Sequence, residues 1–174
     1  SGVALPDNVV SSEDIDKQYG YPLGHTERTS GVVSRHFSVD ETASELADRA
    51  IKAALNDAQM DINDIDCLIG ASGTMEQSIP YNAAKVHAKL NLAKPIPAFD
   101  INMTCLSALM AMDVASTMIV SGQYKNILIF SSEIASVGAD LSKIEVGGLF
   151  GDGAAAMIMS KSASSTSGIR VVHF

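Results

Sequence analysis

The sequence contains no tryptophan, only two cysteines and only five prolines among its 174 residues. Two cysteines far apart in the chain, Cys67 and Cys105, cannot form a disulfide framework and do not have the spacing of a metal-binding motif. Basic residues are also few, because 12 Lys and Arg stand against 20 Asp and Glu and never form a run of three. Nucleic acids and anionic membranes require clustered positive charge, so we expect neither as a partner and we expect no bound metal.

Long hydrophobic runs are absent as well. The most apolar stretch, residues 106–120, is interrupted by Asp113 and is too short to span a bilayer. No charged segment followed by an apolar one opens the chain, as a signal peptide would require. With 47% hydrophobic and 18% charged residues, the composition indicates one globular domain in a reducing, cytoplasmic setting.

Hydrophobic periodicity predicts an alternation of helices and strands. Thr42 and Glu45 form a capping-box pair that opens the clearest amphipathic helix, which ends near Ala58. We predict further helices at 12–18, 81–90 and 105–120, strands at 32–37, 67–72, 98–101, 126–132, 154–160 and 168–174, and a loop at 19–31. The glycine-rich corner 147–153 is predicted to be a tight turn capped by its own Asp152.

This order of elements predicts an α/β fold with a mixed, mainly parallel sheet covered by helices on both faces. Both ends of the chain are abrupt, because the last predicted strand reaches the final residue. We therefore expect residues 1–174 to be one unit of a larger fold, and to expose a large apolar face that pairs with another chain or with the missing unit.

The segment "AFDINMTCLSALMAMDVA" contains the strongest candidate for chemistry. If a strand ends near residue 101 and a helix begins near Leu106, Cys105 lies in the first turn of that helix. Unpaired backbone N–H groups and the positive end of the helix dipole favour a thiolate there. The helix is apolar nearly all round, which predicts an interior position with Cys105 at the floor of a dry pocket that an acyl chain could fill. The alternative is a packing cysteine, which is also the better interpretation of Cys67 inside its predicted strand.

Four stretches resemble β-ketoacyl-acyl-carrier-protein synthase III, a family of the thiolase superfamily. They are "LPDNVVSSEDI", "SGVVSRHF", the cysteine segment above and "FGDGAAAMIMS", and they occur in the family's order and spacing across essentially the whole chain. The resemblance implies the N-terminal half of a thiolase-like αβαβα fold with the order βαβαβαββ, usually a homodimer. The C-terminal half would then lie outside this chain.

The same resemblance implies an activity. Cys105 would be acylated by a primer and would then be attacked by the carbanion formed from a malonyl thioester, with the Cys105 N–H as one oxyanion donor. The substrates would be acyl-CoA or acyl-carrier-protein thioesters, no further cofactor would be needed, and acyl-carrier protein would be a partner. The family's catalytic His and Asn lie in the C-terminal half, and His25, His36, His87 and His173 match no catalytic motif.

Several positions resemble or depart from the family's binding sites. Many members stack the adenine of coenzyme A on a tryptophan, and His25 stands near that position here. Arg28 and Arg35 are candidates for contacting a phosphate of the donor. Ser107 replaces the glycine of the family's C-x-G pattern and is expected to narrow the pocket wall. Ile79, in "EQSIP", would enter the acyl pocket of a partner subunit.

Three alternatives stay open from the sequence. A hydroxymethylglutaryl-CoA synthase type or a starter-unit acyltransferase shares the corner cysteine but uses other partners. A non-catalytic module would use its apolar faces and residues 76–90 for pairing only. Thiol reactivity separates the last alternative from the enzymes, because a buried packing cysteine is inert.

Overall fold

The computed structural model describes residues 1–162 and 168–169 of the chain. Five strands form the main sheet in the order β1-β7-β6-β4-β5. Their bounds are β1 Gly2–Ala4, β4 Cys67–Gly70, β5 Ala98–Asp100, β6 Asn126–Glu133 and β7 Gly153–Ser160. The strand predicted at 168–174 lies, apart from its first two residues, outside the described part of the chain.

The sheet is mixed, as predicted. β4 runs parallel to both of its neighbours, β5 and β6. β7 runs antiparallel to β6 and to β1. Four strands therefore share one direction and β7 alone opposes them, so the carboxyl ends of β4, β5 and β6 meet at one edge of the sheet.

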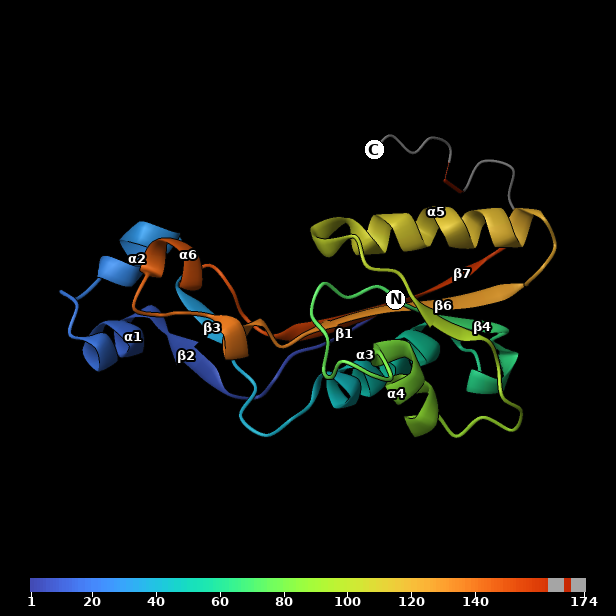
Figure 1. Cartoon of the computed structure of the whole chain (residues 1–174), viewed down its shortest axis with the longest axis horizontal. Helices are drawn as coiled ribbons and strands as arrows, with labels where there is room; N and C mark the ends of the chain where they lie inside the picture. The colour runs from blue at the N-terminus through green and yellow to red at the C-terminus, as the bar shows by residue number, and fades with distance from the viewer. Residues whose placement is uncertain (163–167, 170–174) are drawn as a thin grey trace.

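Helices cover both faces of this sheet (Figure 1). α3 (Ala43–Ala58) and α4 (Asn82–Lys89) pack on one face, and α5 (Ser107–Val120) lies on the other. Read along the chain, the main elements follow the order β1-α3-β4-α4-β5-α5-β6-β7, which is the βαβαβαββ order that the family resemblance implied. No helix in the described residues is long and apolar enough to cross a membrane.

α3 forms where the sequence predicted it. Thr42 accepts a hydrogen bond from the N–H of Glu45, and the Glu45 side chain accepts from the N–H of Thr42 in return. This capping box satisfies two of the donors that a helix start leaves unpaired. Its apolar stripe is buried against the sheet, and Leu46 and Ile51 are fully enclosed, each contributing about 1.5–3 kcal/mol to the free energy of unfolding.

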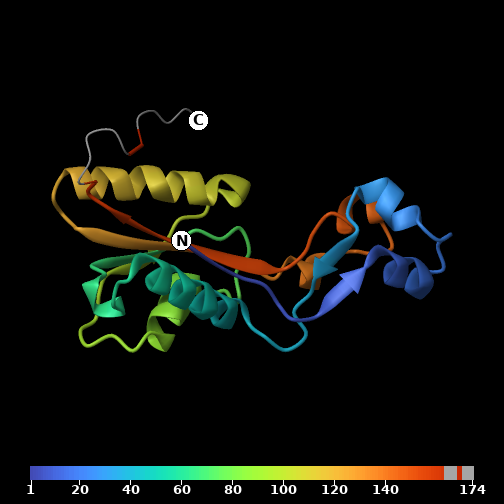
Figure 2. The same ribbon diagram turned by 180° about the vertical axis from the view of Figure 1, so that it is seen from behind.

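A small lobe extends from one end of the sheet and contains two insertions into the main order (Figures 1 and 2). The first insertion follows β1 and the second separates β6 from β7. The lobe comprises β2 Val9–Ser11, α1 Ser12–Tyr19, α2 His25–Ser30, β3 Ser34–His36 and α6 Ile144–Gly147. β2 and β3 pair as a separate two-stranded sheet.

The prediction that residues 19–31 form only a loop was wrong, because α2 lies within them. Gly24 and Gly31 flank this helix in the left-handed conformation, which glycine adopts without steric cost. The buried carboxylate of Asp16, on α1, accepts hydrogen bonds from the N–H groups of His25 and Thr26 at 3.1 and 2.9 Å. The start of α2 is thus capped by a residue of another helix, which local sequence patterns do not reveal.

Asp152 was predicted to cap its own turn, and this prediction was also wrong. Its carboxylate accepts instead from the N–H of Ser38 at 2.7 Å and from the N–H of Ser136 at 2.8 Å. The side chain is buried, so these bonds form away from competing water. Asp152 therefore connects the start of β7 to both insertions and attaches the small lobe to the sheet.

Candidate active site

Cys105 lies in a 3₁₀ turn, Thr104–Leu106, between the end of β5 and the start of α5. The sequence predicted Cys105 in the first turn of the helix, whereas it lies in the 3₁₀ turn that directly precedes the helix. The side chain is exposed. The two backbone bonds of the turn run from Leu106 N to Met103 O and from Ser107 N to Thr104 O. Neither bond uses the N–H of Cys105.

The residue before the cysteine is strained. Thr104 has φ of 52°, in the left-handed region that a β-branched residue adopts at a cost of about 1–3 kcal/mol. The N–H of Thr104 donates to Asn102 Oδ1 at 3.0 Å, and its carbonyl accepts from Ser107 Oγ at 2.7 Å. These side-chain bonds hold the backbone in a corner that places Cys105 at its outer side.

The loop after β4 packs against this corner. A Cβ atom built on Gly73 would lie 3.7 Å from the carbonyl carbon and oxygen of Thr104. Glu133, at the end of β6, fixes the loop by accepting from the N–H groups of Gly73 and Thr74 at 2.6 and 2.8 Å. Its carboxylate also accepts from the Thr74 hydroxyl at 2.5 Å. The ends of β4, β5 and β6 are therefore joined around the cysteine corner.

Two hollows open beside this edge of the sheet. One, of about 420 Å³, lies between Thr74, residues 135–140 and the segment around α6, with Phe150 in its wall. The other, of about 350 Å³, lies between the start of α3, residues 74–76 and Val137. Both are lined by Thr74 and Gly138. Thr74 follows Gly73, which packs against the corner, and none of residues 102–107 lines either hollow.

α5 was predicted to be an interior helix, and in this chain only one side of it is buried. Ser107, Ala111 and Ala115 form that side. Leu106 (just before the helix), Leu109 and Val120 are 42%, 49% and 88% exposed. The helix thus presents the apolar face that the sequence predicted to lack a partner within this chain. Figure 2 shows no helix or strand over its outer side, and near its C-terminal end Gly168 and Ile169 line a hollow together with Ile119 and Val120.

Cys67 has the opposite environment. It is fully buried inside β4, and burial together with the charge of Asp66 raises the pKa of its thiol to about 11. A thiol in such a site stays protonated and inaccessible. The prediction of a packing role for Cys67 is confirmed.

Two of the predicted binding residues are on the surface. Ile79 is 85% exposed, in the loop between β4 and α4, where another subunit can reach it. Arg28 is exposed on α2, and its guanidinium donates to Leu23 O at 3.3 Å. Their roles in binding stay predictions.

The other two, Arg35 and Ser107, are buried. Arg35 is buried, and its Nη2 donates to Gly148 O at 2.9 Å and to Ser12 Oγ at 3.3 Å. Its Nε and Nη1 are buried without a hydrogen-bond partner among the described residues. Ser107 is 1% exposed, and its hydroxyl is used inside the corner rather than in a pocket wall.

The three described histidines make local contacts with a backbone group or a neighbouring ring. His36 Nδ1 lies 2.6 Å from Pro6 O, and His87 Nε2 accepts from the N–H of Ile96 at 3.3 Å. The ring of His25 packs on Tyr21 with centroids 4.8 Å apart. His173 lies outside the described residues.

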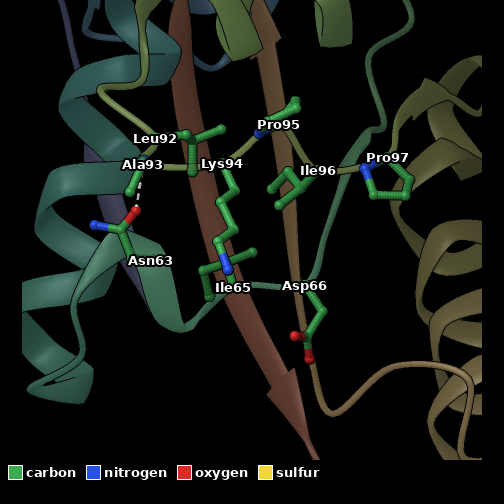
Figure 3. A pocket seen from close by; sticks show the side chains of 9 residues that line it. All are labelled: Asn63, Ile65, Asp66, Leu92, Ala93, Lys94, Pro95, Ile96 and Pro97. Atoms are coloured by element: carbon green, nitrogen blue, oxygen red, sulfur yellow. Dashed lines mark hydrogen bonds between the residues drawn. The ribbon is translucent and has the colours of Figure 1, made fainter.

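A third hollow, of about 460 Å³, lies at the opposite edge of the sheet, before the starts of β4 and β5 (Figure 3). Asn63 Oδ1 accepts from the N–H of Ala93 at 2.8 Å across it. Asp66 is already occupied by the N–H groups of Lys125 and Asn126. The residues that line this hollow include no cysteine, serine, threonine or histidine. Within residues 1–162 and 168–169, no three His, Cys, Asp or Glu side chains are grouped to hold a metal.

Asn102, Thr104 and Glu133 were missed by the sequence interpretation. Asn102 was detectable in principle, because an asparagine two residues before a turn often accepts from that backbone N–H. Thr104 was not, because a left-handed β-branched residue contradicts local preference. Glu133 acts through residues about 60 positions earlier in the chain, a distance that no local pattern covers.

Comparisons with known proteins agree with this arrangement. The family model described as 3-oxoacyl-[acyl-carrier-protein (ACP)] synthase III matches residues 99–174, which include the corner and β7. The chain is 35% identical over 163 residues to a β-ketoacyl-[acyl-carrier-protein] synthase III of Neisseria gonorrhoeae, covering 93% of this chain and 51% of that protein. It is 33% identical over 162 residues to one of Aquifex aeolicus, covering 93% and 52%.

Solved structures show the same likeness. The crystal structure of 3-oxoacyl-[acyl-carrier-protein] synthase III from Aquifex aeolicus VF5 superposes with a TM-score of 0.86 at 33% identity, covering 94% of this chain and 53% of that one. The corresponding structure from Pseudomonas aeruginosa PAO1 gives a TM-score of 0.86 at 26% identity, covering 96% and 52%. The chain spans about half the length of the relatives it matches.

Proposed function

Because this chain belongs to the 3-oxoacyl-[acyl-carrier-protein] synthase III family and has the fold expected of its N-terminal half, we propose that Cys105 is the acyl acceptor of a condensing enzyme. The thiolate attacks the carbonyl of an acyl thioester, the donor thiol leaves, and the acyl group becomes a thioester on Cys105. A malonyl thioester then loses CO₂, and its carbanion attacks this thioester to release the β-ketoacyl product and the free thiol.

The observation that carries the proposal is the exposed thiol in a strained, braced corner at the carboxyl edge of the sheet. In open α/β sheets, ligands bind outside the carboxyl ends of the strands. The N–H of Cys105, which the turn does not use, is proposed as one donor to the oxyanion that forms on the acyl carbonyl. The second donor would come from the rest of the protein.

The two hollows beside Thr74 are proposed as the route for the acyl chain. Ala135, Val146 and Phe150 line one, and Met75, Ile134 and Val137 line the other. These apolar side chains suit contact with a hydrocarbon chain, and charged residues line other parts of both hollows, Asp140 and Lys143 in the first and Glu41 and Glu76 in the second. Ile79 is proposed to complete the pocket of a second subunit, in keeping with its exposure.

The identity of the acyl donor is less constrained. The rings of Tyr21 and His25 pack against each other at a tilt of 31°, and Arg28 is the exposed cation nearest to His25 in sequence. We propose that either acyl-CoA or an acyl-carrier protein delivers the primer. Arg35 and Ser107 are not part of this proposal, because both are buried.

We propose that the chain alone does not complete the condensation. His36 and His87 already have backbone partners, so the His and Asn that assist decarboxylation are expected from the remaining half. The exposed side of α5 is proposed to pack against that half or against a second copy. A clean monomer in light scattering at tens of micromolar, with no binding of the added half, would contradict this pairing.

Intact-mass spectrometry tests the proposal. A protein of the relatives' length that contains this chain is incubated with acetyl-CoA, longer acyl-CoA thioesters and acyl-carrier-protein thioesters, and this chain is tested alone in parallel. We expect one acyl mass on the wild type and none on Cys105→Ala. No acyl mass with any donor on the longer, folded protein would support a non-catalytic pairing role. Acylation without malonyl extension would favour a starter-unit acyltransferase.

A further inference from the structure

Thr104 is held from both sides by side chains. On its amino side, the Thr104 N–H donates to Asn102 Oδ1 at 3.0 Å. On its carboxyl side, Ser107 Oγ donates to the Thr104 carbonyl at 2.7 Å. The peptide group between Thr104 and Cys105 includes that carbonyl, so the hydroxyl acts directly on the backbone that orients the cysteine.

Ser107 also bonds to the residue before Thr104, because its hydroxyl accepts a hydrogen bond from the N–H of Met103 at 2.9 Å. It therefore bonds to the residues on both sides of the Met103–Thr104 peptide. The side chain is only 1% exposed, so water cannot replace either bond. Asn102, in contrast, is exposed and acts at the surface of the corner.

An ordinary helical serine provides a standard for comparison within the same helix. Ser116 Oγ donates to the carbonyl of Asp113, three residues earlier, at 2.7 Å. Ser107 makes the same bond to Thr104 at the same distance. Only Ser107 accepts a second bond from the corner, and only Ser107 has a left-handed residue at the other end of its bond.

We propose that Asn102 and Ser107 are positioning residues for Cys105. Together they keep Thr104 in its left-handed conformation and thereby fix the direction in which the thiol points. This inference rests on the proposed function of Cys105 as acyl acceptor. It adds roles for Asn102 and Ser107, to which the proposed function gives none.

The test measures Cys105 in wild type, Ser107→Ala, Asn102→Ala and the control Ser116→Ala, each in the protein of the relatives' length. Two rates are measured from about pH 6 to pH 10: alkylation by iodoacetamide and acylation by an acyl thioester. We expect about tenfold slower acylation in Ser107→Ala and in Asn102→Ala, because small misplacements of a reacting group cost one to two orders of magnitude in rate. Ser116→Ala is expected to match wild type.

Thr104→Gly separates positioning from general structural support. Glycine adopts positive φ without strain, so residue 104 would keep its left-handed conformation with less support from the side-chain bonds of Asn102 and Ser107. We expect the loss caused by Ser107→Ala to shrink from about tenfold to about twofold in the Thr104→Gly background. A purely structural role of Ser107 would give the same loss in both backgrounds and would overturn the proposal.

Two further outcomes are decisive. If Ser107→Ala does not fold, the proposal is tested with Asn102→Ala and the Asn102→Ala/Thr104→Gly double variant. Asn102 is exposed, so its replacement is expected to leave the protein folded. Acylation and alkylation at wild-type rates in Asn102→Ala would then overturn the proposal. If no thioester acylates the wild type, the proposed function of Cys105 fails. The alkylation rates of the same variants still test the positioning of Cys105 by Asn102 and Ser107, because wild-type alkylation rates in both variants would overturn it.

Discussion

Cys67 and Cys105 lie toward opposite ends of two neighbouring parallel strands, Cys67 at the start of β4 and Cys105 in the turn that follows β5. Cys67 is the first residue of β4, enclosed by α5, β5 and β6. Cys105 follows the end of β5 and is exposed in a strained turn. The burial of Cys67 raises its pKa to about 11, whereas the geometry around Cys105 leaves its thiol open to reagents. The difference shows that position along a parallel strand, rather than residue type, separates a packing thiol from a candidate nucleophile.

The largest expected contrast is in alkylation rate. At pH 8 a thiol with a pKa of about 11 is ionised to only about one part in a thousand, and the Cys67 thiol is also shielded from reagent. We expect iodoacetamide to modify Cys105 at least ~100-fold faster than Cys67 in the native protein. Peptide mass spectrometry over a time course measures both rates. Comparable rates would remove the distinction between the two sites.

A second contrast concerns stability at high pH. The pKa of Cys67 is raised from 9.0 to about 11, so the folded state holds the thiol proton more tightly than the unfolded state. This contribution to stability is complete below pH 9 and is lost as the pH rises toward 11. Between these values we expect the free energy of unfolding of wild type to fall by roughly 2 kcal/mol more than that of Cys67→Ala.

Urea titrations at several pH values measure this difference. Cys105→Ala is the matched control, because its side chain is exposed and its removal should leave the pH dependence of stability unchanged. Parallel curves for wild type and Cys67→Ala would show that the buried thiol does not resist ionisation.

Gly70, the last residue of β4, provides a test of how tightly the sheet is packed at that end of the strand. A Cβ on Gly70 would lie 2.3 Å from Asp100 Oδ1 and 3.2 Å from Phe130 Cζ. The Asp100 carboxylate cannot shift freely, since both oxygens accept from the N–H of Ala83 at 3.0 Å. We expect Gly70→Ala to lower the free energy of unfolding by about 2 kcal/mol, measured by urea denaturation.

Gly73→Ala is the control for that substitution. Its added methyl would meet the corner at an ordinary 3.7 Å, so we expect a change within about 0.5 kcal/mol. An equal loss of stability in both variants would mean that the end of β4 and the loop beyond it are packed alike.

The smallest expected effect comes from the loop that supports the corner. Glu133→Gln replaces a charged acceptor of bonds from Gly73 and Thr74 with a neutral one. We expect a loss of about 1 kcal/mol in the free energy of unfolding and slower acylation of Cys105. Glu145→Gln, on the exposed side of α6, should change neither quantity. Unaltered stability and acylation in Glu133→Gln would show that this loop does not support the site.

Much of the fold was predictable from local patterns. The capping box of Thr42 and Glu45 and the apolar stripe after it define α3, and the alternation of elements predicts the mixed sheet. The elements that were mispredicted depend on distant partners. α2 is capped by Asp16 from α1, and Asp152 bonds to Ser38 and Ser136 rather than to its own turn.

The candidate site was only partly predictable for the same reason. Cys105 follows from the strand-to-helix corner and from the family resemblance. The burial of Arg35 against Gly148 and the inward hydroxyl of Ser107 follow from how distant or strained segments meet, which no residue spacing encodes. Thr104 shows the limit most clearly, since its conformation contradicts its own preference and is imposed by its neighbours.

Locating the acyl group tests the central claim most directly. The longer protein is incubated with its best acyl thioester and digested, and the peptides that contain Cys67 and Cys105 are analysed by mass spectrometry. The account predicts the acyl mass on the Cys105 peptide alone. Acylation of the Cys67 peptide, or an unmodified Cys105 peptide beside an acyl group elsewhere in the folded protein, would contradict it.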